Sequence, residues 1–194
     1  MIIPRKFTAL LSPLVRDYFR RWAGFMYSSV TFNMPDSRYH STPHCERVLL
    51  YALMLAEKIC GDDEQALSIL SHAAVFHDAR REDDGADIGH GARAAEYYAS
   101  YCRSQSEIRF YPEAACLMIC HDRPDVQGVD FISKRLPQKA ETVSLLYKIF
   151  KDADALDRWR LGRYALNPDY LRTREAEDLI GFARKLVELT HRSI

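Results

Sequence analysis

Long apolar runs, an excess of charge of either sign and a secretion signal are all missing from this sequence. No apolar run approaches the roughly 20 residues that a membrane-spanning helix needs. Lysines and arginines together number 27, as do aspartates and glutamates, so the formal net charge is zero. Overall charge therefore gives no reason to expect nucleic acid or an anionic membrane as a partner.

Cysteine is scarce and follows no disulfide spacing. There are five cysteines, an odd number, and the first residues lack the charged and apolar regions of a secretion signal. Both features favour a reducing compartment, so we expect a cytoplasmic protein. Cys116 and Cys120 precede His121 with one residue too many for a haem attachment site. We interpret them as small apolar side chains on one helix face.

Strand-like alternation and flexible Gly/Ser linkers are also nearly absent, whereas helical periodicity is strong. Gly61, the Asn167-Pro168 turn and prolines at helix starts separate the periodic segments. The expected helices cover about residues 7–29, 42–60, 63–77, 90–103, 112–121, 138–160 and 174–191, and the segments 79–89 and 122–137 are expected to be irregular. A chain of 194 residues suits one domain with a sizeable core. The sequence therefore predicts a single all-α domain, a bundle of about six to eight helices.

Histidines and aspartates recur at the ends of these helices or within their apolar stretches. His77 and Asp78 follow the apolar run 69–76, and burying their charge is unfavourable without a partner or a metal. The other members are His44, His90 and His121, with Asp152 and Asp154 in a later helix. Helical bundles build metal sites by such convergence. Imidazole and carboxylate together suit manganese, iron, nickel, cobalt or zinc.

The order of these residues resembles the HD superfamily of all-helical, metal-dependent phosphohydrolases. His44-Cys45-Glu46-Arg47-Val48 is similar to the family's first histidine followed by "RV". Residues 76–81 and 90–95 resemble "HD-x-x-R … HG-x-x-A", and residues 153–157 resemble "ADxLD". The resemblance covers about residues 42–162. It implies an N-terminal helix and connecting loop (1–40), an HD-type metal-binding core (41–162) and a C-terminal helix on that core (163–194).

The resemblance also implies a ligand set. His44, His77, Asp78 and Asp154 are expected to hold one divalent metal, with Asp152 as an alternative last ligand. Asp152 and Asp154 are about 200° apart around a helix, so both cannot point inward equally. His90 and His121 match histidines that bind a second metal or contact phosphate in some members, which leaves one or two ions open. His40, His72 and His191 receive no role in the site.

Arginine binds phosphate oxygens in a bidentate manner, so Arg80 and Arg81 are candidate substrate contacts, with Lys151 as a weaker one. Arg81 matches the family's "HD-x-x-R", and Asp78 and Arg81 are the expected catalytic residues. Some nucleotidases of the family have a glutamate where this chain has Arg81. The irregular segment 122–137 could form a lid.

The leading hypothesis is hydrolysis of a nucleotide or another small phosphoester or phosphoanhydride by metal-activated water. One alternative is a di-iron oxygenase of the HD type. A second alternative is a degenerate module that binds a nucleotide as a sensor. The expected partner is a small phosphate compound. The N-terminal helix could either cap the bundle or form the interface of a homo-oligomer.

Overall fold

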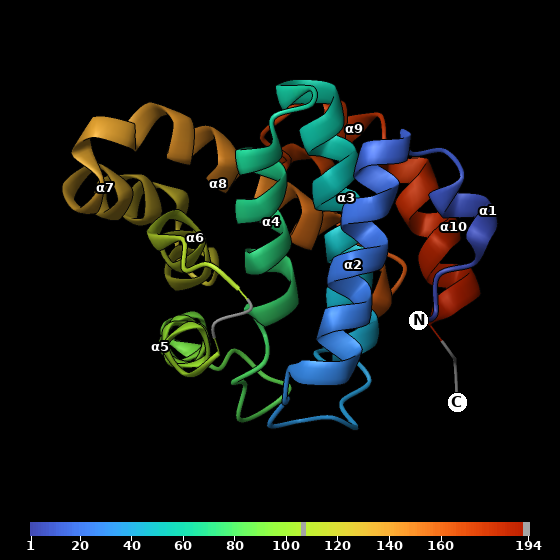
Figure 1. The fold of residues 1–194 in the computed structure, drawn as a ribbon. Helices are drawn as coiled ribbons and strands as arrows, with labels where there is room; N and C mark the ends of the chain where they lie inside the picture. The colour runs from blue at the N-terminus through green and yellow to red at the C-terminus, as the bar shows by residue number, and fades with distance from the viewer. Residues whose placement is uncertain (106–107, 192–194) are drawn as a thin grey trace.

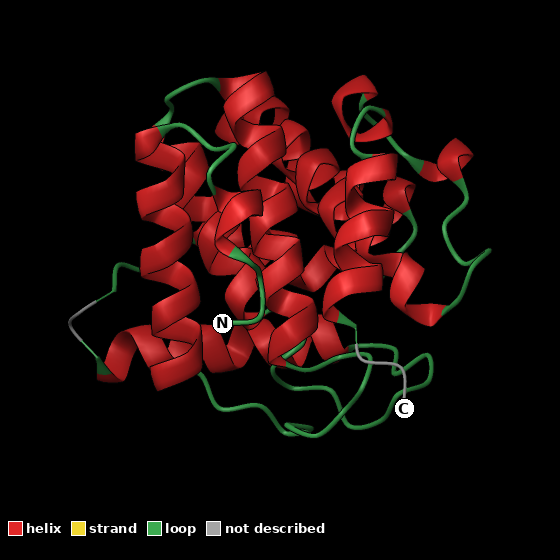
Figure 2. Cartoon of the chain, turned by 90° about the vertical axis from the view of Figure 1, so that its right-hand side faces the viewer, coloured by secondary structure: helices red, strands yellow, loops and turns green. Residues whose placement is uncertain are grey.

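The computed structural model describes residues 1–105 and 108–191, and in this part of the chain every regular element is a helix (Figures 1 and 2). The α-helices are α1 (Arg5–Thr8), α2 (Pro13–Ser29), α3 (Thr42–Cys60), α4 (Glu64–Phe76), α5 (His90–Ser104), α6 (Pro112–His121), α7 (Asp125–Arg135), α8 (Ala140–Leu156), α9 (Arg174–Glu177) and α10 (Ile180–Thr190). Short 3-10 helices are η1 (Pro137–Lys139), η2 (Asp157–Leu161) and η3 (Pro168–Tyr170). The predicted all-α class is confirmed. None of the described helices is long and apolar enough to cross a membrane.

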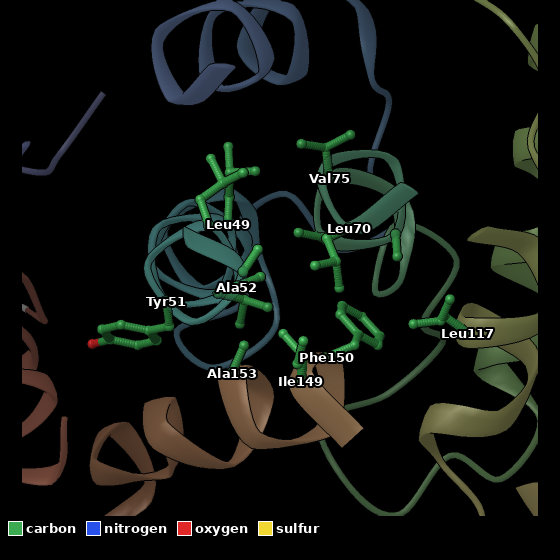
Figure 3. Close-up of a cluster of buried hydrophobic side chains, with 14 of the residues drawn as sticks. Leu49, Tyr51, Ala52, Leu70, Val75, Leu117, Ile149, Phe150 and Ala153 are labelled. Carbon is green, nitrogen blue, oxygen red and sulfur yellow. The ribbon is translucent and has the colours of Figure 1, made fainter. Parts of the chain in front are cut away.

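The centre of the molecule is formed by α3, α4 and α8, which pack against one another. Figure 3 shows Ala52 of α3, Leu70 of α4, and Ile149 and Phe150 of α8 between the three helices, with Leu49 on the face of α3 turned away from α8. All five are fully buried. Burial of a large apolar side chain stabilises a fold by about 1.5–3 kcal/mol. This core fixes the three helices that contribute His44, His77 and Asp154.

The remaining helices cover this centre. On one side α2 packs against α3 and α4, and on another α6 packs against α4 and α8 and carries α5 and α7. The connections that follow α2 and α4 lie at the same end of the bundle (Figure 1). They are joined there by a hydrogen bond from Asn33 N–H to Ala79 O of 3.0 Å. The His77-Asp78 pair therefore lies at a covered end of the bundle.

The N-terminal segment departs from the expected single helix over 7–29. It forms α1 and α2, separated at residues 9–12. Proline cannot donate the hydrogen bond required in a helix interior, and Pro13 instead begins α2 after Ser12, whose hydroxyl caps Val15 N–H at 3.4 Å. Leu10, an apolar residue in this break, is 67% exposed.

The prediction of an irregular segment over 122–137 was wrong for most of its length. Residues 125–135 form α7, with Pro124 at its N-cap and Asp125 in its first turn. Gly128 made this segment look like a loop, yet it is buried in the helix. A Cβ there would lie 2.4 Å from the hydroxyl oxygen of Tyr147. Glycine at this position therefore allows α7 to approach α8.

The C-terminal helices are also shorter than expected. The predicted helix over 138–160 is divided into η1, α8 and η2, and the one over 174–191 into α9 and α10. Helix α10 packs against η2. At the other end of the chain, the backbone N–H groups of Ile2 and Ile3 donate to the buried carboxylate of Glu46 at 2.9–3.1 Å. The first residues are thereby attached to α3.

His72 provides a test of this packing that is independent of the candidate site. Its Nδ1 is 2.7 Å from the Tyr98 hydroxyl, and burial lowers its pKa to about 3. In the unfolded chain the His72 imidazole is protonated below about pH 6.5, whereas in the folded protein it stays neutral until the pH approaches 3. Protonation therefore favours the unfolded chain, and the free energy of unfolding falls as the pH drops below 6.5. Relative to His72→Gln, we expect the metal-free wild type to lose ~2 kcal/mol of unfolding free energy between pH 7.5 and pH 5. Urea unfolding of both proteins measures this difference, and parallel pH curves would contradict it.

Candidate metal centre

His77 and Asp78 lie directly after the last turn of α4. His77 is the C-cap residue and is fully buried, and Asp78 is 4% exposed. The imidazole Nδ1 of His77 lies 3.0 Å from Ala74 O, one turn earlier. A neutral imidazole with its proton on Nδ1 donates to that carbonyl and leaves Nε2 as an acceptor. The end of the helix thus fixes the direction of the His77 lone pair.

His44 and Asp154 meet His77 from α3 and α8. His44 is in the first turn of α3, and its Nε2 lies 3.2 Å from His77 Nε2 and 3.3 Å from Asp154 Oδ1. The same Nε2 is 3.5 Å from Asp78 Oδ2. Three ligand atoms from His44, His77 and Asp154 lie close enough together to hold a metal ion.

His90 and His121 approach Asp78 at Oδ1, the oxygen that His77 also faces. His90 begins α5, and its Nε2 is 3.1 Å from Asp78 Oδ1. His121 ends α6, with its Nε2 2.8 Å from His90 Nε2 and 3.7 Å from Asp78 Oδ1. Gly91 makes this approach of α5 and α6 possible, because a Cβ there would lie 2.1 Å from Met118 O. Asp78 thus faces His77, His90 and His121 with Oδ1 and His44 with Oδ2, and ligand atoms of His77, Asp78 and His121 form another group close enough for a metal.

In the imidazoles of His44, His77, His90 and His121, Nδ1 lies within hydrogen-bond distance of an acceptor. The acceptors are the Asp157 carboxylate for His44 at 2.7 Å, Ala74 O for His77 at 3.0 Å, Asp87 O for His90 at 2.8 Å and Met118 O for His121 at 2.6 Å. These partners assign the proton to Nδ1 in the neutral rings. Metal-binding histidines are held in this way by a partner of the second nitrogen.

The contacts between Nε2 atoms test whether a metal suits the cluster. In the neutral rings there is no hydrogen between His44 and His77 or between His90 and His121, so lone pairs face each other at 3.2 and 2.8 Å. Two nitrogens each about 2.0–2.1 Å from one divalent ion, at about 90° to each other, are about 2.9 Å apart. The observed separations and the nitrogen and carboxylate donors therefore fit a divalent transition metal.

The electrostatics of the cluster also favour a bound cation. Burial raises the pKa of the Asp78 carboxyl, but the imidazoles of His77, His121, His40 and His90, in the forms that carry a proton on the nitrogen facing Asp78, outweigh it and hold that pKa well below its usual range. For His121, burial lowers the pKa, but the hydrogen bond and charge of Asp78 outweigh this effect and raise it. In contrast, burial lowers the pKa of His77 to about 3. The cluster thus combines an ionised carboxylate with a neutral imidazole and attracts positive charge.

His40 is a member of the cluster that the sequence analysis excluded. It lies in the connection before α3, is 8% exposed, and places its Nδ1 2.9 Å from Asp78 Oδ2. The guanidinium of Arg160 fixes this connection, because its Nε donates to Tyr39 O at 2.6 Å. His40, His44 and Asp78 form a further group of ligand atoms close enough for a metal.

Asp157 is a second residue to which the sequence analysis gave no role. Its carboxylate lies behind His44 and accepts from Arg47 Nε at 2.6 Å and from Arg47 Nη2 at 2.9 Å. All three side chains are buried. Burial raises the pKa of Asp157, but the Arg47 charge and the His44 hydrogen bond outweigh it and lower that pKa to about 2. The ionised Asp157 therefore orients His44 toward the cluster.

Asp152, the alternative to Asp154 as last ligand, lies outside the cluster. Its fully buried carboxylate accepts from the backbone N–H groups of Arg172 and Thr173 at 2.9–3.1 Å and from the Arg172 guanidinium at 3.2 Å. Two residues along α8, Asp154 faces His44 instead, as the angular separation of about 200° required. Asp152 therefore attaches the segment before α9 to α8.

A cavity of about 420 Å³ opens above the cluster and is lined by Asp78, His90, His121 and Asp154. Arg81 and Lys151 also line it. Arg81 is held by Asp83 O at 3.2 Å and Gly85 O at 2.6 Å, with Nη1 3.2 Å from His90 Nε2. Its charge is therefore fixed beside the proposed ligands.

Arg80, expected as a candidate substrate contact, is not among the residues that line the cavity. Its guanidinium carbon is 3.3 Å from the centroid of the Tyr97 ring, and Nη1 donates to Thr31 O and to Ala79 O, the latter at 3.0 Å. The side chain fastens the end of α4 to α5 and to the connection after α2. Adjacent residues in a turn point in different directions, which separates Arg80 from Arg81.

Within the described residues no cysteine is among the grouped ligand atoms, although Cys45 Sγ lies 3.8 Å from His77 Nδ1. Cys116 and Cys120 are buried, and burial raises the pKa of their thiols to about 11 and about 12. A thiol with such a pKa is a poor metal ligand at neutral pH, because the thiolate is the binding form. Cys116 and Cys120 are therefore apolar packing residues of α6.

No protein-family model matches this chain, and no curated protein or solved structure matches it either. The assignment of a function therefore depends on the residues of the cluster and on the cavity above it.

Proposed function

We propose that this protein is a metal-dependent phosphohydrolase of the HD type that acts on a nucleotide or another small phosphoester. The observation that carries the proposal is the buried cluster, in which the Asp78 carboxylate lies 3.1–3.8 Å from the Nε2 atoms of His44, His77, His90 and His121. The order of these residues along the chain, followed by Asp154, resembles that of the HD superfamily. The open cavity and the fixed charge of Arg81 support a phosphate substrate.

The proposed ligands of one divalent metal are His44, His77, Asp78 and Asp154, and those of a second are Asp78, His90 and His121. Such a metal, when bound, supplies Lewis acidity that polarises the phosphoryl group and makes water more acidic. The donor set suits manganese, iron, cobalt, nickel or zinc. His40 holds the second oxygen of Asp78 and so fixes the orientation of the carboxylate.

In the proposed reaction, Asp78 accepts a hydrogen bond from the attacking water and orients it toward phosphorus. The water oxygen forms a bond to phosphorus, the ester P–O bond breaks, and a proton from the water ends on the leaving oxygen. The guanidinium of Arg81 neutralises charge on the phosphoryl oxygens, because phosphoryl transfer depends mainly on positioning and electrostatics. The products are inorganic phosphate and the free alcohol, or the shortened nucleotide from an anhydride.

A phosphate-release assay tests the proposal. The metal-stripped protein is assayed against nucleoside mono-, di- and triphosphates and small phosphomonoesters, with manganese, cobalt, nickel, iron or zinc added singly. We expect release with at least one metal, loss of release on chelation and its recovery when that metal is restored. Absence of release with every metal would contradict the proposal.

A di-iron oxygenase of the HD type is the second candidate, because His90 and His121 provide nitrogen ligands for a second ion beside Asp78. Anaerobic purification, iron analysis and a Mössbauer spectrum distinguish it from the hydrolase. Two coupled iron atoms per chain, together with absence of phosphate release, would favour the oxygenase. Without turnover or coupled iron, tight binding of a nucleotide would favour the third hypothesis, a sensor.

A further inference from the structure

The cavity above the cluster continues into a second one. The second cavity has a volume of about 310 Å³ and shares His121, Lys151, Asp154 and Arg158 with the first. Its outer part is lined by Leu166, Asn167 and Tyr170 of the segment between η2 and α9. A molecule with its phosphate at the cluster therefore has room for its other end against this segment.

Asp152, the alternative metal ligand, holds the segment that forms one wall of the second cavity. The Asp152 carboxylate accepts from Arg172 N–H, from Thr173 N–H and from the Thr173 hydroxyl at 2.8–3.1 Å. The Arg172 guanidinium also donates to Asp125 of α7 at 2.8–2.9 Å. A segment held in this way is organised before ligand binding, which lowers the entropic cost of association.

Positive charge dominates the lining of the second cavity. Its cations are Lys151, Arg158 and Arg172, and the only carboxylate in its lining within the described chain is Asp154, which belongs to the cluster. Arg172 is neutralised by Asp152 and Asp125. Lys151 donates to Arg123 O at 2.7 Å and is 3.2 Å from Asp125.

Arg158 is exposed to solvent and lines both cavities. Its Nε donates to Ala165 O at 2.9 Å, which fixes the guanidinium at the boundary between the two cavities. In residues 1–105 and 108–191 no carboxylate forms an ion pair with it. An arginine whose Nε is anchored presents its two terminal nitrogens as a fork that suits a carboxylate or phosphate group.

We infer that the substrate carries a second anionic group, a carboxylate or a phosphate, on the part that leaves, and that Arg158 and Lys151 bind it in the second cavity. This inference rests on the proposed function, since it places the scissile phosphate at the cluster. The aromatic ring of Tyr170 and the side chain of Leu166 contact the organic part between the two anionic groups. The substrate class is thus a small phosphoester with two anionic ends.

Binding of phosphonates that cannot be hydrolysed tests the inference separately from turnover. Calorimetry with the manganese-loaded protein compares phenylphosphonate, 4-carboxyphenylphosphonate and benzene-1,4-bisphosphonate. We expect at least one of the two doubly anionic compounds to bind about tenfold more tightly than phenylphosphonate. The tighter of the two identifies the second anion as carboxylate or phosphate.

Arg158→Gln is expected to remove most of this preference, measured within each protein as the ratio of the affinity for the doubly anionic compound to that for phenylphosphonate. The matched control is Arg163→Gln, since Arg163 lies five residues further along, near the Tyr164 ring, and lines neither cavity. Equal affinities of the three compounds in the wild type would overturn the inference, as would a preference that survives in Arg158→Gln. A preserved preference without phosphate release from any phosphoester would contradict only the proposed hydrolase activity.

Discussion

Replacement of His77 by alanine is expected to abolish metal binding and phosphate release while leaving helical content intact. His77 provides an Nε2 that faces His44 at 3.2 Å, and loss of even an indirect partner of a ligand lowers metal affinity 10–100-fold. We therefore expect a loss of affinity greater than about 100-fold for His77→Ala and Asp78→Ala. Calorimetric titration with manganese, with circular dichroism as the check on folding, measures it.

Thermal unfolding provides a second reading of the same variants. Metal at 100 times its dissociation constant stabilises a folded protein by about 2.7 kcal/mol, and this increment should be present in the wild type and absent in His77→Ala. His72→Gln is the matched control, because His72 is a buried histidine of α4 outside the cluster. It should lower stability and keep the metal-dependent increment. Full activity of a metal-free His77→Ala protein would contradict the account.

Removal of Asp157 is expected to destabilise the fold by about 3–5 kcal/mol, because it leaves the fully buried guanidinium of Arg47 without its partner. The same change removes the acceptor of the His44 Nδ1 proton. We expect Asp157→Ala to reduce both stability and metal affinity. Urea unfolding of the metal-free protein measures the first effect and manganese titration the second.

A double variant separates these two roles of Asp157. In Arg47→Leu with Asp157→Leu, no charge is left unpaired, so much of the lost stability should return. His44 still lacks the carboxylate that orients it, so metal affinity should stay 10–100-fold below that of the wild type. Recovery of stability and metal affinity together would show that Asp157 does not position His44.

The all-α fold was predictable because apolar residues recur at helical spacing through most of the chain. Local exceptions to that pattern were not. Helix α7 was missed because Gly128 and the flanking prolines are typical of a loop, whereas Gly128 is required by a neighbour far away in sequence, Tyr147. The break between α1 and α2 was signalled by Pro13, but apolar residues on both sides of it favoured one long helix.

The candidate site was predictable where its residues lie on regular helices or at their ends. Asp154 was expected as the last ligand from the resemblance, with Asp152 as an alternative, because the angle between the two shows only that they face different ways. His40 was missed because it lies in an irregular connection, where no periodicity places a side chain. Asp157 was missed because its partners, His44 and Arg47, are more than 100 residues earlier in the chain.

The central claim is that the buried histidine and aspartate cluster binds a divalent metal. The most direct measurement is an anomalous difference map from crystals of the manganese-loaded protein. The account predicts a peak at the Nε2 atoms of His44 and His77, or at those of His90 and His121, or at both, beside the carboxylate of Asp78. A map without a peak in the cluster, from crystals with manganese at saturating concentration, would contradict it.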